Sequence, residues 1–255
     1  MYDQGKCISC GRCVTRCSKG CHRIENGKHI LARENCSACG ECTSSLCTAL
    51  ALSGKDISAS EVLTDLLKDQ VFYKTSGGGI TLSGGEPLTQ GEFCVEILRM
   101  AKENGLHTCI ETCGQTSKDV IARSAEYTDL YLFDVKETDP NLHARFTGVD
   151  NRQIFENLDL LNTLGKAVIL RCPLIPNFNC RDEHLIAIAN IANSFENVIG
   201  IELEPYHELG ASKYEKLGRV YSVSSNAANS EFYDTYVEIL KNHTVKSVKI
   251  LKHEL

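Results

Sequence analysis

The sequence lacks the signals that would direct a protein into a membrane, out of the cell or onto nucleic acid. No uninterrupted apolar run approaches the ~20 residues that a membrane-spanning helix needs. The first residues, MYDQGKCISC, contain no basic segment followed by an apolar stretch, so we expect no signal peptide. The net charge of −6 gives no electrostatic reason to expect nucleic acid or an anionic membrane as a partner. We therefore expect a cytoplasmic protein.

Cysteine is the residue type whose number is unusual, with 14 among 255 residues. Nine of these cysteines lie within the first 47 residues of the chain. In a chain with no export signal, clustered thiols indicate metal or redox chemistry instead of disulfides. The uneven distribution predicts a cysteine-rich domain over residues 1–56 and a larger domain over residues 57–255.

The cysteine-rich segment contains two runs of similar spacing. The first reads Cys-x2-Cys-x2-Cys-x3-Cys and the second Cys-x2-Cys-x2-Cys-x4-Cys. This pattern is typical of bacterial two-cluster ferredoxins, in which the fourth cysteine of each run binds the cluster held by the other run. It predicts two [4Fe–4S] clusters in a ferredoxin-like domain. The predicted ligands are Cys7, Cys10, Cys13 and Cys47 for one cluster, and Cys36, Cys39, Cys42 and Cys17 for the other.

Several features leave alternatives open. Ser18 and Thr48 stand where proline commonly follows the fourth cysteine, and the spacing before Cys47 is one residue longer than in the first run. Cys21 is an additional thiol that either replaces one ligand or packs in the interior. Zinc is the alternative metal, but zinc prefers two CxxC pairs with four ligands in all. Two runs of three closely spaced cysteines favour iron–sulfur clusters.

From about residue 57 the sequence alternates between amphipathic segments and continuous apolar segments. We expect helices at 61–73 (with Ser60 as its N-cap), 91–105, 117–127, 151–165, 182–195 and 231–243, and strands at 77–85, 106–113, 129–136, 167–175, 198–206 and 245–251. Apolar strands that alternate with helices predict a parallel sheet covered by helices, either doubly wound or a (β/α) barrel. No GxGxxG occurs at a strand–helix turn, so a dinucleotide site has no support.

Polar residues stand at the carboxyl ends of successive expected strands. They are Ser83 to Glu86, Glu111 and Thr112, Asp134 to Lys136, Arg171, and Glu204 to His207. In a (β/α) barrel the carboxyl ends of the strands surround the mouth of the active site. The glycines of SGGGITLSGGEP would let a ligand approach the main chain without interference from side chains. We therefore expect a ligand site at these strand ends.

Six motifs of the larger domain carry a resemblance to a known family: SGGGITLSGGEP, IETCG, DLYLFDVK, TGVDN, RCPLIP and EPYHELG. Together they resemble the activating enzymes of glycyl-radical enzymes. These belong to the radical S-adenosylmethionine (SAM) superfamily and include the pyruvate formate-lyase activating enzyme. The cysteine-rich segment makes the subgroup with a ferredoxin-like insert the nearer match. The resemblance implies an α/β fold, namely an incomplete (β/α) barrel of the radical SAM type whose first strand is missing, after the two-cluster domain.

The resemblance also implies that nine strand-end residues bind SAM. Gly84, Gly85 and Glu86 would receive the amino group of SAM, and Glu111 and Thr112 would lie beside its carboxylate and a monovalent cation. Asp134 and Lys136 would lie near its methionine and ribose parts, Arg171 near the site, and His207 near the adenosine part. The remaining cysteines, Cys94, Cys109, Cys113, Cys172 and Cys180, show no ligand spacing and are expected to be small buried residues.

The reaction implied by the resemblance is the reductive cleavage of SAM to methionine and a 5′-deoxyadenosyl radical. That radical abstracts hydrogen from a glycine of a partner glycyl-radical enzyme. A donor such as flavodoxin or ferredoxin would supply the electron, and the accessory clusters would relay it.

The defining motif of the family, Cys-x3-Cys-x2-Cys, holds a third [4Fe–4S] cluster with an open position, and it does not occur in this sequence. We therefore expect that N-terminal sequence has been lost, that no catalytic residue can be named, and that the chain is inactive as given. The alternative is an iron–sulfur electron-transfer protein or a SAM-binding protein without radical chemistry.

Overall fold

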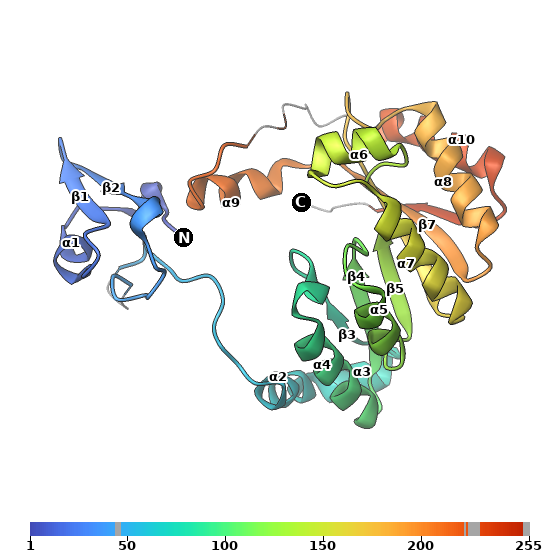
Figure 1. Ribbon diagram of the computed structural model, residues 1–255, viewed down its shortest axis with the longest axis horizontal. Coiled ribbons are helices and arrows are strands. Elements are labelled where there is room, and N and C mark those ends of the chain that lie inside the picture. The colour runs from blue at the N-terminus through green and yellow to red at the C-terminus, as the bar shows by residue number, and fades with distance from the viewer. Residues whose placement is uncertain (44–46, 222, 224–229, 252–255) are drawn as a thin grey trace. The chain divides into compact units, whose positions relative to one another are not determined.

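The computed structural model describes residues 1–43, 47–221, 223 and 230–251. The chain divides into two compact units, shown as a ribbon in Figure 1. We call residues 1–56 and 207–224 the cysteine-rich unit, and residues 57–206 and 225–255 the sheet unit. Within the described ranges, no helix is both long enough and apolar enough to cross a membrane.

The cysteine-rich unit contains two cysteine loops and a short hairpin. The hairpin pairs β1 (His22–Glu25) with β2 (Lys28–Leu31) in antiparallel fashion. The 3-10 turns η1 (Gln4–Lys6) and η2 (Arg33–Asn35) each lead directly into a cysteine loop, and α1 (Arg12–Arg16) follows the first loop. An isolated antiparallel bridge between Tyr2 and Leu50 joins the start of the chain to the residues that follow the second cysteine run.

The two cysteine loops repeat one backbone conformation. Ser9 has a φ of 52° and Ala38, at the same place in the second loop, a φ of 53°. Gly11 and Gly40 follow at 74° and 81°. A residue other than glycine rarely adopts a positive φ. The matched pairs therefore show that the two cysteine runs form the same loop twice.

The segment 207–224, with η5 (Glu208–Gly210) and α9 (Ala211–Lys216), is part of the cysteine-rich unit. The carbonyl oxygen of Lys216 accepts hydrogen bonds from the backbone N–H of Tyr2 at 2.9 Å and from Nη2 of Arg33 at 2.8 Å. Gly218 lies against the same arginine, and a Cβ at Gly218 would clash with the Arg33 side chain. These contacts attach a segment that is distant in sequence to the first residues of the chain.

The sheet unit is built on a six-stranded parallel sheet, which confirms the expected α/β class. Its strands are β3 (Gly79–Leu82), β4 (His107–Thr112), β5 (Leu130–Asp134), β6 (Ala167–Leu174), β7 (Val198–Pro205) and β8 (Ser247–Ile250), in that order across the sheet. The order in space follows the order in sequence, so each crossover turns the same way and the helices lie on one side. A doubly wound sheet would reverse its strand order, whereas a (β/α) barrel does not.

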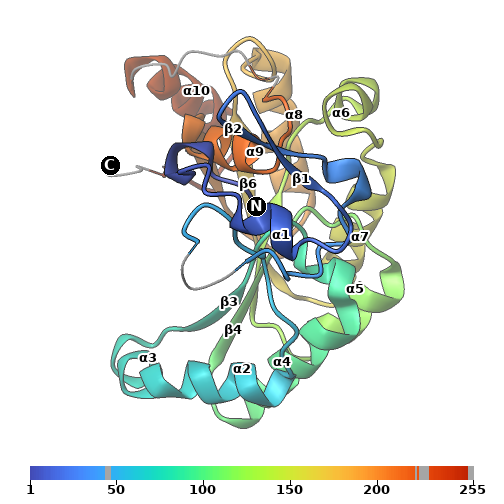
Figure 2. The ribbon, with the colours of Figure 1, turned by 90° about the vertical axis from the view of Figure 1, so that its left-hand side faces the viewer.

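Helices cover one face of this sheet (Figures 1 and 2). They are α4 (Gly91–Glu103), α5 (Lys118–Ala125), α7 (Arg152–Thr163), α8 (Asp182–Ser194) and α10 (Ser230–His243). The other helical elements are α2 (Ala59–Leu66), η3 (Leu67–Asp69), α3 (Gln70–Ser76), η4 (Pro87–Gln90) and α6 (Pro140–Thr147). The expected helices are present, but α6 was not expected. The N-cap of α2 is Ser58, because its hydroxyl accepts from the backbone N–H of Glu61, and Ser60 lies inside the helix.

Alternation along the strands separates an apolar face from a polar one. Ile110, Phe133 and Leu170 are completely buried in the core beneath the helices. Their neighbours Glu111, Asp134 and Arg171 point to the opposite face, because successive residues of a strand alternate between faces. The parallel sheet therefore gathers charged side chains on one face, near the carboxyl ends of its strands.

A buried charge holds the loop that follows β5. The side chain of Glu137 is completely buried, and its two oxygens accept from Nη2 of Arg181 at 2.9 and 2.8 Å. Nδ1 of His184 lies 3.3 Å from Glu137 Oε1. Burial by itself raises the pKa of Glu137, but hydrogen bonds from His184 and Arg181 lower it to about 2. Nearby, the Asn179 amide donates to the carbonyl oxygen of Lys136 at 2.9 Å. The contacts of Glu137 and Asn179 thus hold the loop that carries Lys136 in place.

We predict that Glu137→Gln lowers the free energy of unfolding by about 3 kcal/mol at pH 7, because it leaves the partly buried guanidinium of Arg181 without its charged partner. The pKa of Glu137 is lowered from 4.5 to about 2, so its stabilising effect is complete above about pH 4.5 and is lost as the pH falls towards 2. The difference between variant and wild type should therefore shrink between pH 7 and pH 3.5 when urea unfolding is followed by far-UV circular dichroism.

The control is Glu103→Gln, which removes an exposed carboxylate paired with Arg99 on α4. This change should cost less than about 1 kcal/mol at either pH. A difference for Glu137→Gln that stays the same at both pH values would contradict the proposed ionised state of Glu137.

Candidate functional site

The cysteines of the two runs line two separate cavities. The first cysteine cavity, of about 90 Å³, is lined by Cys7, Cys10, Cys13, Cys42 and Cys47. The second cysteine cavity, of about 190 Å³, is lined by Cys17, Cys21, Cys36, Cys39 and Cys42. Each cavity receives a fourth cysteine from the other run, Cys47 in the first and Cys17 in the second. The structure thus brings both predicted ligand sets together.

Cys13 and Cys42 have different thiols around them. Burial raises the pKa of Cys13, and the neighbouring Cys7 and Cys47 raise it further. Burial likewise raises the pKa of Cys42, and the thiols that add to the effect are Cys17, Cys36 and Cys39. The thiols that act on Cys42 are thus those of the second predicted set, although Cys42 also lines the first cavity.

Cys21 lies beside Cys17 in the second cavity. Its backbone N–H donates to Cys17 Sγ at 3.3 Å, and the residue is only 1% exposed. Burial, together with Cys17 and Cys36, raises the pKa of Cys21 to about 11. The two thiols that the sequence offered for the eighth ligand position, Cys47 and Cys21, thus line different cavities.

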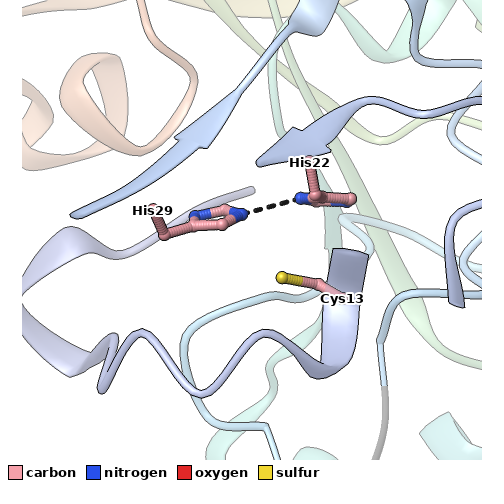
Figure 3. Close-up of side chains that lie close together, drawn as sticks. All are labelled: Cys13, His22 and His29. Atoms are coloured by element: carbon pink, nitrogen blue, oxygen red, sulfur yellow. Dashed lines mark hydrogen bonds between the residues drawn. The ribbon is translucent and has the colours of Figure 1, made fainter. Parts of the chain in front are cut away.

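Two histidines that the sequence reading missed lie next to Cys13 (Figure 3). His22 Nδ1 and His29 Nε2 are 2.8 Å apart, and the ligand atoms of all three residues lie within 4.8 Å of one another. Burial lowers the pKa of both histidines, so both are neutral and available as ligands. A structural zinc site needs four ligands, and these three make an incomplete set. No ligand spacing in the sequence identifies them, because they meet only where the hairpin pairs β1 with β2.

At the polar face of the sheet unit, three carboxylates surround one guanidinium. Arg171 Nη1 lies 2.9 Å from Glu111 Oε1 and 3.7 Å from Glu204 Oε1. Arg171 Nε donates to Glu202 Oε2 at 3.1 Å. The four side chains are between 15 and 30% exposed. The group keeps an excess of negative charge, and Glu202 is a member that the sequence reading did not identify.

A second charge pair lies in the neighbouring strand. Lys136 Nζ donates to Asp134 Oδ2 at 2.6 Å, and Asp134 is in register with Arg171 on β6. Burial raises the pKa of Asp134, and Lys136 opposes the shift. Burial also raises the pKa of Glu204, against the effect of Arg171. Carboxylates that repel one another at a half-buried face can bind a cation, and the two basic groups can bind a carboxylate.

The glycine loop after β3 offers open main chain to a ligand. Gly84 has a φ of +136°, and a Cβ built on Gly84 or Gly85 would meet no atom within 4 Å. The carboxylate of Glu86 accepts hydrogen bonds from the backbone N–H of Leu88 at 3.1 Å, from Thr112 Oγ1 at 2.7 Å and from the backbone N–H of Cys113 at 2.8 Å. Glu86 therefore fastens the loop to the end of β4, and the open main chain of the two glycines is the part that a ligand can reach.

Two other expected site residues do not join this group of charges. Thr112 is 2% exposed and lies on the opposite face of β4 from Glu111, where it donates to Glu86. His207 is a residue of the cysteine-rich unit. Ser83, in contrast, reaches the group, since its hydroxyl donates to Glu111 Oε2 at 2.7 Å.

Comparison with known proteins gives consistent matches. Residues 35–190 match the family model described as "Radical SAM superfamily". The chain is 36% identical over 261 residues to the choline trimethylamine-lyase activating enzyme of Oleidesulfovibrio alaskensis, covering 99% of this chain and 84% of that protein. It is 33% identical over 225 residues to the trans-4-hydroxy-L-proline dehydratase activating enzyme of Clostridioides difficile, covering 87% of this chain and 74% of that protein.

A solved domain of the pyruvate formate-lyase-activating enzyme from Bacteroides vulgatus superposes with a TM-score of 0.56 at 25% identity, covering 68% of this chain and 98% of that domain. The family model spans more than half of the chain, and the relatives match over most of their own length. The chain therefore belongs to the radical SAM superfamily and, within it, to the glycyl-radical-enzyme activating enzymes.

Proposed function

We propose that these residues form the SAM-binding sheet and the accessory electron-transfer domain of an enzyme that activates a glycyl-radical enzyme. Membership of the superfamily implies SAM and a [4Fe–4S] cluster as cofactors. The observation that carries the proposal is the group of charges around Arg171, because it lies where a (β/α) enzyme of this type places its active site. Residues 1–56 are proposed as a ferredoxin-like domain and residues 57–255 as a partial barrel without its first strand.

The strand-end residues fit SAM by their chemistry. SAM carries a sulfonium, an ammonium and a carboxylate, so it needs partners of both signs. Glu111, Glu204 and Asp134 supply negative charge, and Lys136 and Arg171 supply positive charge. The open main chain at Gly84 and Gly85 suits the amino group of the ligand. The excess negative charge beside Glu111 also suits a monovalent cation.

The two cysteine cavities fit two accessory [4Fe–4S] clusters. Each cavity brings together three cysteines from one run and the fourth from the other, as a two-cluster ferredoxin requires. A set of four thiolates holds a cubane by all four irons, which suits electron transfer and leaves no position for SAM. We propose that a flavodoxin or ferredoxin reduces these clusters.

The cluster that cleaves SAM does not fit the residues present. The sequence contains no Cys-x3-Cys-x2-Cys, and the described cysteines near the charged group, Cys109, Cys113 and Cys172, do not have that spacing. We propose that the 255 residues bind SAM but do not cleave it. The cleavage, and the abstraction of hydrogen from a glycine of the partner, require that motif. The same absence favours the second candidate, an electron-transfer or SAM-binding protein without radical chemistry.

We predict about eight irons per chain after anaerobic reconstitution, because two cubanes contain that number. Cys10→Ser and Cys39→Ser should each reduce the iron content to about four and remove one of two electron paramagnetic resonance signals. Cys47→Ser should act like Cys10→Ser, because both thiols line the first cavity. Cys94→Ser, a buried cysteine of α4, should leave the iron content unchanged. Fewer than about eight irons in the wild type, or zinc in equal amount, would refute the two clusters.

We predict that Asp134→Asn weakens SAM binding about tenfold. The substitution removes one carboxylate that would attract the positive charges of SAM, and it keeps the shape of the side chain. Isothermal titration calorimetry on the reconstituted protein measures this effect. Glu103→Gln, which changes an exposed carboxylate of α4, should bind SAM as the wild type does. Equal affinities for SAM in the wild type, Asp134→Asn and Glu103→Gln would contradict SAM binding at the strand ends.

We predict that the 255-residue protein forms no 5′-deoxyadenosine when it is incubated with SAM and dithionite. A version preceded by a segment that contains Cys-x3-Cys-x2-Cys, taken from the choline trimethylamine-lyase activating enzyme that it resembles, should form 5′-deoxyadenosine and methionine in equal amounts. Chromatography of both products gives the result. Cleavage by the 255-residue protein itself would contradict the proposal, and its absence from both versions would favour the second candidate.

A further inference from the structure

We propose that the surface around the first cysteine cavity is the docking site for an acidic one-electron carrier protein. The proposal rests on the accessory clusters proposed above and adds the place at which the reductant binds. It follows from the distribution of charge, from the residues that line the cavity and from the exposed apolar side chain at its opening.

The cysteine-rich unit is basic although the protein is acidic. Its residues include eleven Lys and Arg against seven Asp and Glu, a net charge of +4. The whole chain carries −6, so the sheet unit carries −10. A basic unit on an acidic chain attracts an acidic protein to one part of its surface, and such steering raises the rate of encounter at low salt.

Within this unit the basic side chains gather at the first cavity. Lys6, Arg12 and Arg16 line it and are exposed, and the described residues that line it include no Asp or Glu. Lys6 is 4.0 Å from Asp3, and the ion pairs of the described residues include neither Arg12 nor Arg16. The charges of Arg12 and Arg16 are therefore free to meet a partner, and Asp3 offsets part of the charge of Lys6.

The second cavity presents a different rim. Lys19, Arg33 and Glu41 line it, so the acidic side chain offsets part of the charge. Arg33 is also occupied, because its Nη2 donates to the carbonyl oxygen of Lys216. The first cavity is thus the better site for an acidic partner.

An exposed apolar residue lies at the opening of the first cavity. Ile8 stands between Cys7 and Cys10, lines the cavity and is 85% exposed. Val14, on α1 between the two arginines, is 37% exposed. An apolar centre within a charged rim is the composition of a small transient interface. Cys10 is itself exposed, so a carrier seated here would approach the cluster closely. One electron then leaves the reduced centre of the carrier and enters the cluster, with no bond formed or broken.

The test compares two triple variants of the reconstituted protein. The first, Lys6→Ala with Arg12→Ala and Arg16→Ala, removes the charges of the first cavity. The matched control, Lys28→Ala with Lys55→Ala and Lys213→Ala, removes three exposed charges elsewhere in the same unit. Stopped-flow absorbance measures reduction of the clusters by a reduced flavodoxin at low and at physiological ionic strength.

We expect the first triple variant to be reduced about tenfold more slowly than the wild type at low salt, with a weaker dependence on salt. The control should stay within about twofold of the wild type. Ile8→Ser should slow the reaction at both salt concentrations, because the apolar contact is not screened. Photoreduced 5-deazaflavin is a small reductant without the acidic surface of a carrier protein, so it should reduce the clusters of all the proteins equally fast.

Different results overturn different claims. If the wild type shows no cluster signal in electron paramagnetic resonance, the accessory clusters are refuted and the docking site with them. If the clusters are intact and the first triple variant reacts like the wild type, the docking site alone is refuted. The assignment to the first cavity is refuted if the control triple variant loses as much of the reduction rate as the first triple variant. It is also refuted if Lys19→Ala, at the second cavity, loses more.

Discussion

The polar face of the sheet depends on the ion pairs that the guanidinium of Arg171 makes. This guanidinium lies between carboxylates from β4 and β7, at 2.9 Å from Glu111 and 3.1 Å from Glu202. Without a central cation these half-buried carboxylates would repel one another, and some would have to take up a proton to remain buried. One arginine thus connects three strands and keeps the site negative without making it unstable. A site with that balance can take a ligand that carries both signs of charge.

The surrounding loops are held so that the site does not depend on flexible segments. Glu86 accepts three hydrogen bonds from protein donors, which secures the glycine loop to β4 and leaves its main chain open. Glu137 and Asn179 do the same for the loop with Lys136. In each case a polar side chain that is partly or completely buried satisfies backbone groups that would otherwise be unpaired. Glu86, Glu137 and Asn179 therefore support the residues that are proposed to contact the ligand. A sequence motif does not distinguish a supporting residue from a contacting one.

Local patterns were enough to predict much of the fold. The helices and strands of the sheet unit follow from apolar periodicity, and the spacing of the cysteines predicts that they gather at two places, as the two cavities that they line show. The errors have physical causes. Ser58 and Ser60 both suit an N-cap, and only the reciprocal bond with Glu61 decides between them. The helix α6 is short and polar in sequence, with a modest apolar face, and it begins at Pro140 after the capping residue Asp139.

The sequence by itself determined the family, the parallel sheet and the identity of most charged residues at the strand ends, because each depends on residue type and spacing. Only the tertiary structure decided which of them act together. Glu202 joins Arg171 because parallel strands place Arg171 opposite it in register. Thr112 is not part of the charged group, because its side chain points to the other face of the sheet. His22 and His29 meet because a hairpin pairs their strands. The attachment of residues 207–224 to the first residues of the chain is likewise a long-range contact. Such pairings depend on distances between segments far apart in the chain, and spacing along the chain does not contain them.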